Sequence, residues 1–138
     1  MILLDTNVIF AIMRLDQEPA VQAWLDRQEA ALLYTTSPTV FEIHFGAKSL
    51  PNGRRRRELE AMIKVVFSAT FEGRIMDFDA GAAEAAASIR ASQRKRGLSP
   101  DIPDSQIAGI ALHHGAPLVT RNVRDFAGLG ISLINPWE

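Results

Sequence analysis

The chain has 138 residues, no cysteine and a net charge of −1, and 47% of its residues are hydrophobic against 22% charged. This length and balance are typical of one globular domain covering residues 1–138. The lack of cysteine excludes a disulfide framework, a thiolate zinc site and a cysteine nucleophile. Nucleic-acid binders are more often basic, so the net charge of −1 counts mildly against nucleic-acid binding.

The first half of the chain predicts strands that alternate with helices. Val21, Trp24 and Leu25 recur at helical spacing, and Ser37-Pro38 opens a helix because serine caps helices and proline suits their first position. The elements in chain order are a strand at Ile2–Leu4, helices at Asn7–Met13 and Asp16 to about Gln28, a strand at Leu32–Thr35, a helix from Ser37 to the turn Pro51–Gly53, and a helix from Arg54 to about Phe71 that buries Leu59, Met62, Ile63 and Val66.

The second half continues the alternation. Asp79 caps a long helix that ends near Gly97. The elements in order are a strand at Arg74–Phe78, that helix, a loop at Leu98–Ile102, a helix from Pro103 to Gly115, a strand at Pro117–Thr120, one helical turn near Asp125 and a strand at Ile131–Ile134. The pattern predicts an α/β fold with a central parallel sheet of four to five strands and helices on both faces.

No secretory signal opens the chain, because Asp5 interrupts the first apolar run and no basic segment precedes it. No apolar stretch approaches the ~20 residues of a membrane span. We therefore expect a soluble, cytoplasmic protein.

Polar residues are expected at one end of the sheet, where ligands gather in open α/β folds. Asp5 follows the first strand. Glu42 lies in the first turns of the helix after the second strand, and Asp104 lies at the start of the helix that leads to the fourth strand. Asn122 and Asp125 follow that fourth strand. Carboxylates from separate segments repel unless a cation lies between them, and oxygen donors favour magnesium over zinc.

Each of these residues also has a simpler structural interpretation. Asp5 can cap the first helix, and Glu42 can complete a capping box with Thr39. Asp104 can be a first-turn acid that the helix dipole favours, and Asn122 can be a turn residue. Independent caps have no reason to gather at one end of a sheet, so the metal interpretation is preferred.

The order of these residues resembles the PIN-domain nucleases. Four segments carry the resemblance along the length of the chain: Met1-Ile2-Leu3-Leu4-Asp5-Thr6-Asn7, Ser37-Pro38-Thr39-Val40-Phe41-Glu42-Ile43, Pro103-Asp104-Ser105-Gln106-Ile107-Ala108-Gly109-Ile110-Ala111 and Val119-Thr120-Arg121-Asn122-Val123-Arg124-Asp125-Phe126. The ending Asn135-Pro136-Trp137 resembles the FitB branch of the VapC-type toxins.

The resemblance implies a single-domain, three-layer PIN-like fold and a magnesium- or manganese-dependent endoribonuclease, the toxin of a type II toxin–antitoxin pair. Asp5, Glu42 and Asp104 match the family's catalytic acids and would hold the metal, with Thr6 as a supporting hydroxyl. The fourth position often holds aspartate in the family, whereas this chain has Asn122, and Asp125 is a nearby substitute.

The resemblance also implies partners. These are an RNA substrate, an antitoxin protein and a second copy of the chain in a homodimer, with DNA contacted only through the antitoxin and no membrane. The main alternative is a catalytically weak PIN fold that acts with its antitoxin in a DNA-binding repressor complex, which Asn122 favours. DNA as the substrate is a further alternative. A phosphatase of the haloacid-dehalogenase type would need a second aspartate where the chain has Asn7.

Some basic and aromatic residues keep two interpretations. Arg54–Arg57 can follow an RNA backbone or form a solvated helix start, which is commoner. Arg121 can pair with an acid or meet phosphate. The aromatic residues on helical stripes are expected in the core, although some can form a dimer face or an antitoxin groove; they are Trp24, Phe41, Phe45 and Phe71.

Overall fold

The structure is a computed structural model that describes residues 1–138. Its centre is a five-stranded sheet in the order β3-β2-β1-β4-β5, and every neighbouring pair of strands is parallel. The strands are β1 Ile2–Leu4, β2 Leu33–Thr36, β3 Ile75–Met76, β4 Leu118–Val119 and β5 Leu133–Ile134. The expected parallel α/β sheet is confirmed.

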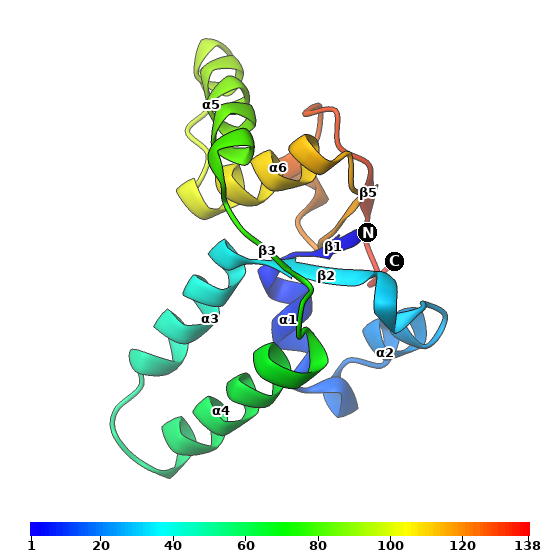
Figure 1. Cartoon of the computed structure of the whole chain (residues 1–138), viewed down its shortest axis with the longest axis vertical. Helices are drawn as coiled ribbons and strands as arrows, with labels where there is room; N and C mark the ends of the chain where they lie inside the picture. The colour runs from blue at the N-terminus through cyan, green and yellow to red at the C-terminus, as the bar shows by residue number, and fades with distance from the viewer.

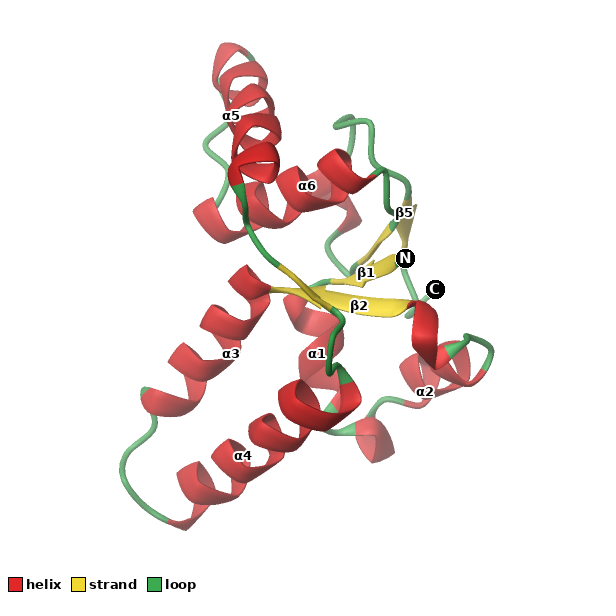
Figure 2. Ribbon diagram, viewed as in Figure 1, coloured by secondary structure: helices red, strands yellow, loops and turns green.

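The helices cover both faces of this sheet (Figures 1 and 2). In Figure 1, α1 to α4 lie below the strands and α5 and α6 lie above them. The helices are α1 Thr6–Ile12, α2 Pro19–Asp26, α3 Ser37–Lys48, α4 Arg54–Val65, α5 Ala80–Lys95 and α6 Ile102–His114. Short helical turns are η1 Leu15–Gln17, η2 Ala30–Leu32, η3 Val66–Thr70 and η4 Val123–Phe126.

The central strand β1 separates two hydrophobic clusters. Successive side chains of a strand point to opposite faces, so the fully buried Leu3 and Leu4 belong to different clusters. Leu4 packs with Ile43 and Ile63 from α3 and α4. Leu3 packs with residues of α5 and α6 on the other face. Because β1 is buried on both faces, the residue that follows it is held at the centre of the sheet edge.

Helices α5 and α6 approach each other closely at Gly109. A Cβ built on Gly109 would lie 2.5 Å from the carbonyl oxygen of Ala82 and 2.7 Å from the Cβ of Ala86. Only glycine fits this contact without a shift of one helix. The close packing holds α6, whose first turn carries Asp104, against α5.

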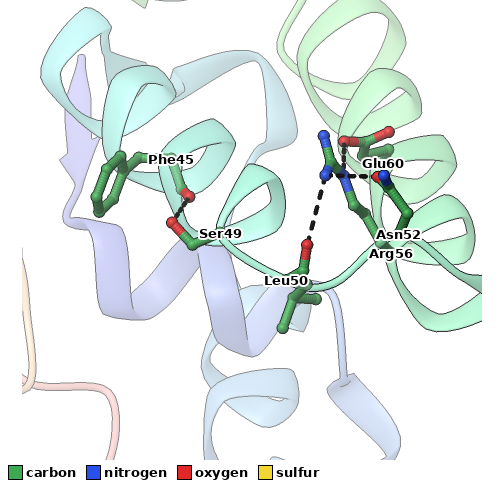
Figure 3. Close-up of polar contacts among 6 residues, drawn as sticks. All are labelled: Phe45, Ser49, Leu50, Asn52, Arg56 and Glu60. Atoms are coloured by element: carbon green, nitrogen blue, oxygen red, sulfur yellow. Dashed lines mark hydrogen bonds and ion pairs between the residues drawn. The ribbon is translucent and has the colours of Figure 1, made fainter.

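Helices α3 and α4 form a hairpin whose turn is held by Arg56 (Figure 3). Its guanidinium group donates to Glu60 at 3.0 Å, to the Asn52 side chain at 2.9 Å and to the Leu50 carbonyl oxygen at 3.4 Å. Part of the basic segment Arg54–Arg57 therefore serves the fold.

Several expectations about single residues are wrong. Phe41 and Phe45 were expected in the core, yet their exposed fractions are 68% and 65%, whereas Trp24 and Phe71 are buried. Met62 is also exposed. The N-cap of α3 is Thr36 rather than the expected Ser37.

Strand β1 has the predicted bounds, and β2 has the predicted length but lies one residue later. Strands β3, β4 and β5 are shorter than predicted, and α6 begins one residue before Pro103. No helix is both long enough and apolar enough to cross a membrane.

Candidate active site

Asp5 lies directly after β1 and is almost fully buried, with an exposed fraction of 3%. Its Oδ1 accepts a hydrogen bond from the Thr6 backbone N–H at 2.8 Å. Its Oδ2 accepts from the Thr120 hydroxyl at 2.7 Å and from the Asn7 side-chain amide at 3.4 Å. Three donors thus fix the orientation of this carboxylate. Asp5 also occupies the N-cap position of α1, so the interpretation of Asp5 as a helix cap correctly describes its position.

Glu42 lies on α3, and Thr6 links it to Asp5 by hydrogen bonds to both residues. The Thr6 hydroxyl donates to Glu42 Oε1 at 2.7 Å and lies 3.0 Å from the Thr39 hydroxyl. The N-cap of α3 is Thr36, whose hydroxyl oxygen accepts from the Thr39 backbone N–H. The predicted Ser37 cap is therefore wrong, because Thr36 caps the helix. The alternative interpretation of Glu42 as part of a capping box with Thr39 is also wrong, since Glu42 contacts Thr6 of α1 instead.

Asp104 lies in the first turn of α6, as the dipole interpretation requires. Three residues earlier, Asp101 occupies the N-cap position of this helix, and its side chain makes no cap hydrogen bond. Asp101 was not among the predicted site residues. Its spacing of three from Asp104 at a helix start was the available signal, because such a pair shares a helix face.

Thr120 joins the end of β4 to Asp5. While its hydroxyl donates to Asp5, its oxygen accepts from the Asn122 backbone N–H at 3.0 Å. Thr120 is fully buried, and it too was missed, although it ends a predicted strand. Asn122 itself occupies the N-cap position of η4 without a side-chain cap bond.

Arg121 pairs with no acid. Its guanidinium carbon lies 5.0 Å from the centre of the Trp137 ring, and none of the ion pairs of the chain includes it. The interpretation of Arg121 as the partner of an acid is therefore wrong.

All six predicted site residues meet at one open hollow of about 470 Å³. It is lined by Asp5, Thr6, Asn7, Phe10, Glu42, Asp101, Asp104, Asn122 and Asp125. The structure thus brings together residues from the end of β1, from α3, from the start of α6 and from η4.

The acids of this hollow influence one another. Burial, followed by the charges of Asp5, Asp101, Asp125 and Glu42, raises the pKa of Asp104 to about 7. No arginine or lysine forms an ion pair with any of them. The hollow is therefore an acidic site without a protein counter-charge.

Burial also raises the pKa values of the other two expected acids. At Asp5 the hydrogen bonds from Thr120 and Thr6 oppose this effect, and the charge of Asp125 adds to it. At Glu42 the hydrogen bond from Thr6 opposes it. Both groups are thus held by donors that favour their charged forms.

The donor set fits a hard divalent cation. No three acidic or histidine side chains stand where together they could hold one metal ion. Mg²⁺, however, usually takes only one or two protein carboxylates and completes its shell with waters and phosphate oxygens. The oxygen donors and the uncompensated negative charge suit that mode of binding.

Comparison with known proteins agrees with this geometry. The family model described as PIN domain matches residues 2–130. The chain is 35% identical to VapC ribonuclease Y4jK of Sinorhizobium fredii and 34% identical to toxin FitB of Neisseria gonorrhoeae, covering 100% of this chain and 99% of each relative.

Solved structures show the same fold. The crystal structure of FitAcB from Neisseria gonorrhoeae superposes with a TM-score of 0.90 at 33% identity and covers 100% of this chain and 99% of that one. A structure of FitAB bound to an IR36 DNA fragment gives the same TM-score and identity. From the fold, the full-length similarity and the arrangement of the acids, we conclude that the chain belongs to the PIN-domain family.

Proposed function

We propose that the chain is a magnesium- or manganese-dependent endoribonuclease, the toxin of a toxin–antitoxin pair, acting in the cytoplasm. The observation that carries the proposal is the hollow in which Asp5, Glu42 and Asp104 lie together without a protein cation. Relatives named as VapC ribonuclease and tRNA(fMet)-specific endonuclease VapC of Shigella flexneri support RNA as the substrate.

Each acid has a distinct role in this proposal. Asp5 and Asp104 would hold the ion directly, and Glu42 would position it. When bound, the ion neutralises charge on the scissile phosphate and helps a water to lose its proton. Thr120 and the Thr6 backbone N–H fix the Asp5 carboxylate, while the Thr6 hydroxyl fixes that of Glu42. No covalent nucleophile is required.

The fourth position is shared between two residues. Asn122 and Asp125 both line the hollow. Asp125 is the charged member and acts on the pKa values of Asp5 and Asp104. Asp125 would therefore supply the charge that aspartate supplies in other members of the family, and Asn122 would contribute its side-chain carbonyl oxygen.

An antitoxin and a second copy of the chain are the proposed protein partners. Several solved relatives are toxin–antitoxin complexes. Helix α3 exposes Phe41 and Phe45, whose rings stack with centroids 6.2 Å apart, beside the acidic Glu42. Exposed aromatic side chains of this kind are typical of a protein interface.

The direct test is cleavage of RNA by purified protein with Mn²⁺ or Mg²⁺, compared with Asp5→Asn and Asp104→Asn. Both variants are expected to lose at least about a hundredfold in rate, since each removes a charged ligand. The matched control is Asp26→Asn, a change of the same kind at an exposed position of α2. Equal cleavage by wild type and Asp5→Asn would overturn the assignment.

The same experiment addresses the two alternatives. A weak or inactive binding module would fold and show no metal-dependent cleavage under any condition. A deoxyribonuclease would cleave single-stranded DNA of the same sequence faster than RNA. We expect the reverse preference.

A further inference from the structure

The chain has two dense basic clusters, and the structure distinguishes them. In the first, Arg54–Arg57, Arg54 pairs with Glu58 at 2.7 Å and Arg56 pairs with Glu60 at 3.0 Å. Figure 3 shows how Arg56 is also tied to the α3–α4 turn. Two of the four arginines of this cluster are therefore held by acids of α4, whereas Arg55 and Arg57 take part in no ion pair. The hollows that lead from the second cluster to the acidic site are not lined by any residue of this one.

The second cluster lies near the end of α5, and its cations have no acidic partner. Arg90, Arg94 and Lys95 are exposed on the last turns of α5, and none takes part in an ion pair. Together with residues 98–100 they line an open hollow of about 600 Å³. A hollow lined by free cations suits an anionic ligand of extended shape.

This basic hollow adjoins the acidic site through one intermediate hollow. The intermediate hollow, of about 480 Å³, shares Leu98, Ser99 and Pro100 with the basic one. It shares Asp101, Asp104 and Asp125 with the acidic one, and Arg124 also lines it. The three hollows form a connected path from the end of α5 to the acids.

Helix stability alone does not account for these cations. The negative end of a helix favours cations only within its last turn, which contains Arg94 and Lys95 but not Arg90. Arg90 and Arg94 are four residues apart, a spacing at which like charges destabilise a helix. A ligand with negative charge would offset that repulsion.

We infer that Arg90, Arg94 and Lys95 bind backbone phosphates of the RNA strand at a distance from the scissile bond, on one side of it. The bound strand follows the path over residues 98–100, with Arg124 midway, into the acidic site. Phosphate contacts set the position and affinity of a nucleic acid rather than its sequence. The inference rests on the proposed function, because it takes RNA as the substrate.

The test is RNA binding in the presence of EDTA, so that no metal-dependent cleavage takes place. The probe is a fluorescein-labelled oligouridine of about 12 nucleotides, which is long enough to span a groove of this kind, and anisotropy is read over a series of KCl concentrations. The variant is Arg90→Gln/Arg94→Gln/Lys95→Gln. The control, Arg54→Gln/Arg55→Gln/Arg57→Gln, removes the same charge from α4.

The α5 variant is expected to bind about tenfold or more weakly. The slope of log affinity against log salt should fall by about 2, because each phosphate contact on a single strand contributes about 0.7. The α4 control should bind like the wild type. Equal weakening of both variants, no weakening of the α5 variant, or no RNA binding by the wild type would each overturn the inference.

The result is separable from that of the cleavage assay. Wild type that binds through α5 but never cleaves RNA would overturn the proposed function and leave the inference intact. Wild type that cleaves RNA, with an α5 variant that binds normally, would do the opposite. Circular dichroism of both triple variants checks that their folds are unchanged.

Discussion

At the scale of single residues, Asp104 is held where its neutral form is favoured. Burial and four neighbouring acids raise its pKa to about 7, whereas an aspartate in an unfolded chain titrates near 3.8. The folded protein therefore binds this proton more tightly than the unfolded chain does. A divalent cation would reverse this preference, because it favours the charged carboxylate.

A pH dependence of stability follows from that shift. The raised pKa of Asp104 contributes stability that is fully present below its pKa in the unfolded chain, 3.8. This stability is lost as the pH rises through its pKa in the folded protein, about 7. Without metal, Asp104→Asn should therefore match the wild type at low pH and exceed its melting temperature by a few degrees at about pH 8. Thermal unfolding in EDTA across this range measures the difference. A difference that stays constant with pH would contradict the assignment of the shift to Asp104.

Gln93 on α5 is a second residue in unusual surroundings. Its side chain is buried, with an exposed fraction of 5%, and its Oε1 has no hydrogen-bond partner. A buried unpaired acceptor costs about 1–3 kcal/mol. Gln93→Leu, which has a similar size, should raise the free energy of unfolding by about 1 kcal/mol in urea titrations. Gln22→Leu, at an exposed position of α2, should change the free energy of unfolding by less than about 0.5 kcal/mol. A lower stability for Gln93→Leu would show that the amide makes a favourable contact.

The sequence predicts those residues of the site that lie near the ends of strands. Asp5 directly follows β1, and Glu42 lies in the second turn of α3, the helix that follows β2. The carboxyl ends of parallel strands meet at one edge of a sheet, so the order of elements brings both acids to that edge. What the sequence does not contain is the contact between Glu42 and Thr6, which are 36 residues apart. Thr120 was missed although it ends a predicted strand, because its hydrogen bond to Asp5 joins residues 115 positions apart. Asp101 was missed although it lies only three residues before Asp104 at the start of α6.

At the scale of elements, α3 shows why a helical stripe can be assigned to the wrong face. Thr39, Ile43 and Ala47 are buried, whereas Phe41 and Phe45 repeat at the same spacing on another face and are exposed. Both stripes satisfy the helical period, and periodicity does not tell which one meets the sheet. Phe41 and Phe45 were expected in the core because they repeat at helical spacing, but tertiary packing turns that stripe outward.

The strand and helix order was predictable throughout, but the ends of the elements were not. The shortest strands, β3, β4 and β5, have two residues each. Their hydrogen-bonded length depends on how far the neighbouring strands twist, which the sequence does not state. The same limit applies to the start of α6.

The contact between α5 and α6 allows a test with a matched pair of glycines. Gly109→Ala places a Cβ against the backbone of α5 and should lower the free energy of unfolding by about 1–3 kcal/mol. Gly46→Ala in α3 meets only ordinary contact, with Phe10 at 3.8 Å, and should raise it by about 0.5–1 kcal/mol. Chemical denaturation of both variants measures these changes. Two glycines with the same effect would contradict the close approach of the helices.

At the scale of the whole molecule, a net charge near zero conceals a separation of charge. The acids gather at the edge of the sheet, while the free cations of the α5 cluster lie at the far end of a connected path. Such a separation can attract a polyanion at one end and a cation at the other. The overall charge of −1 therefore does not argue against nucleic-acid binding, as it did when considered alone.

The acidic site exists only in the folded chain, and this predicts how metal affects stability. Asp5, Glu42 and Asp104 come from segments that the unfolded chain separates by tens of residues, so the ion should bind the folded state far more tightly than the unfolded one. A concentration of about 100 times the dissociation constant would then stabilise the protein by about 2.7 kcal/mol. Urea midpoints measured in EDTA and in MnCl₂ test this without any activity assay. The gain should shrink strongly in Asp5→Asn and Asp104→Asn and persist in Asp26→Asn. A gain of equal size in all four proteins would place the bound ion elsewhere on the surface.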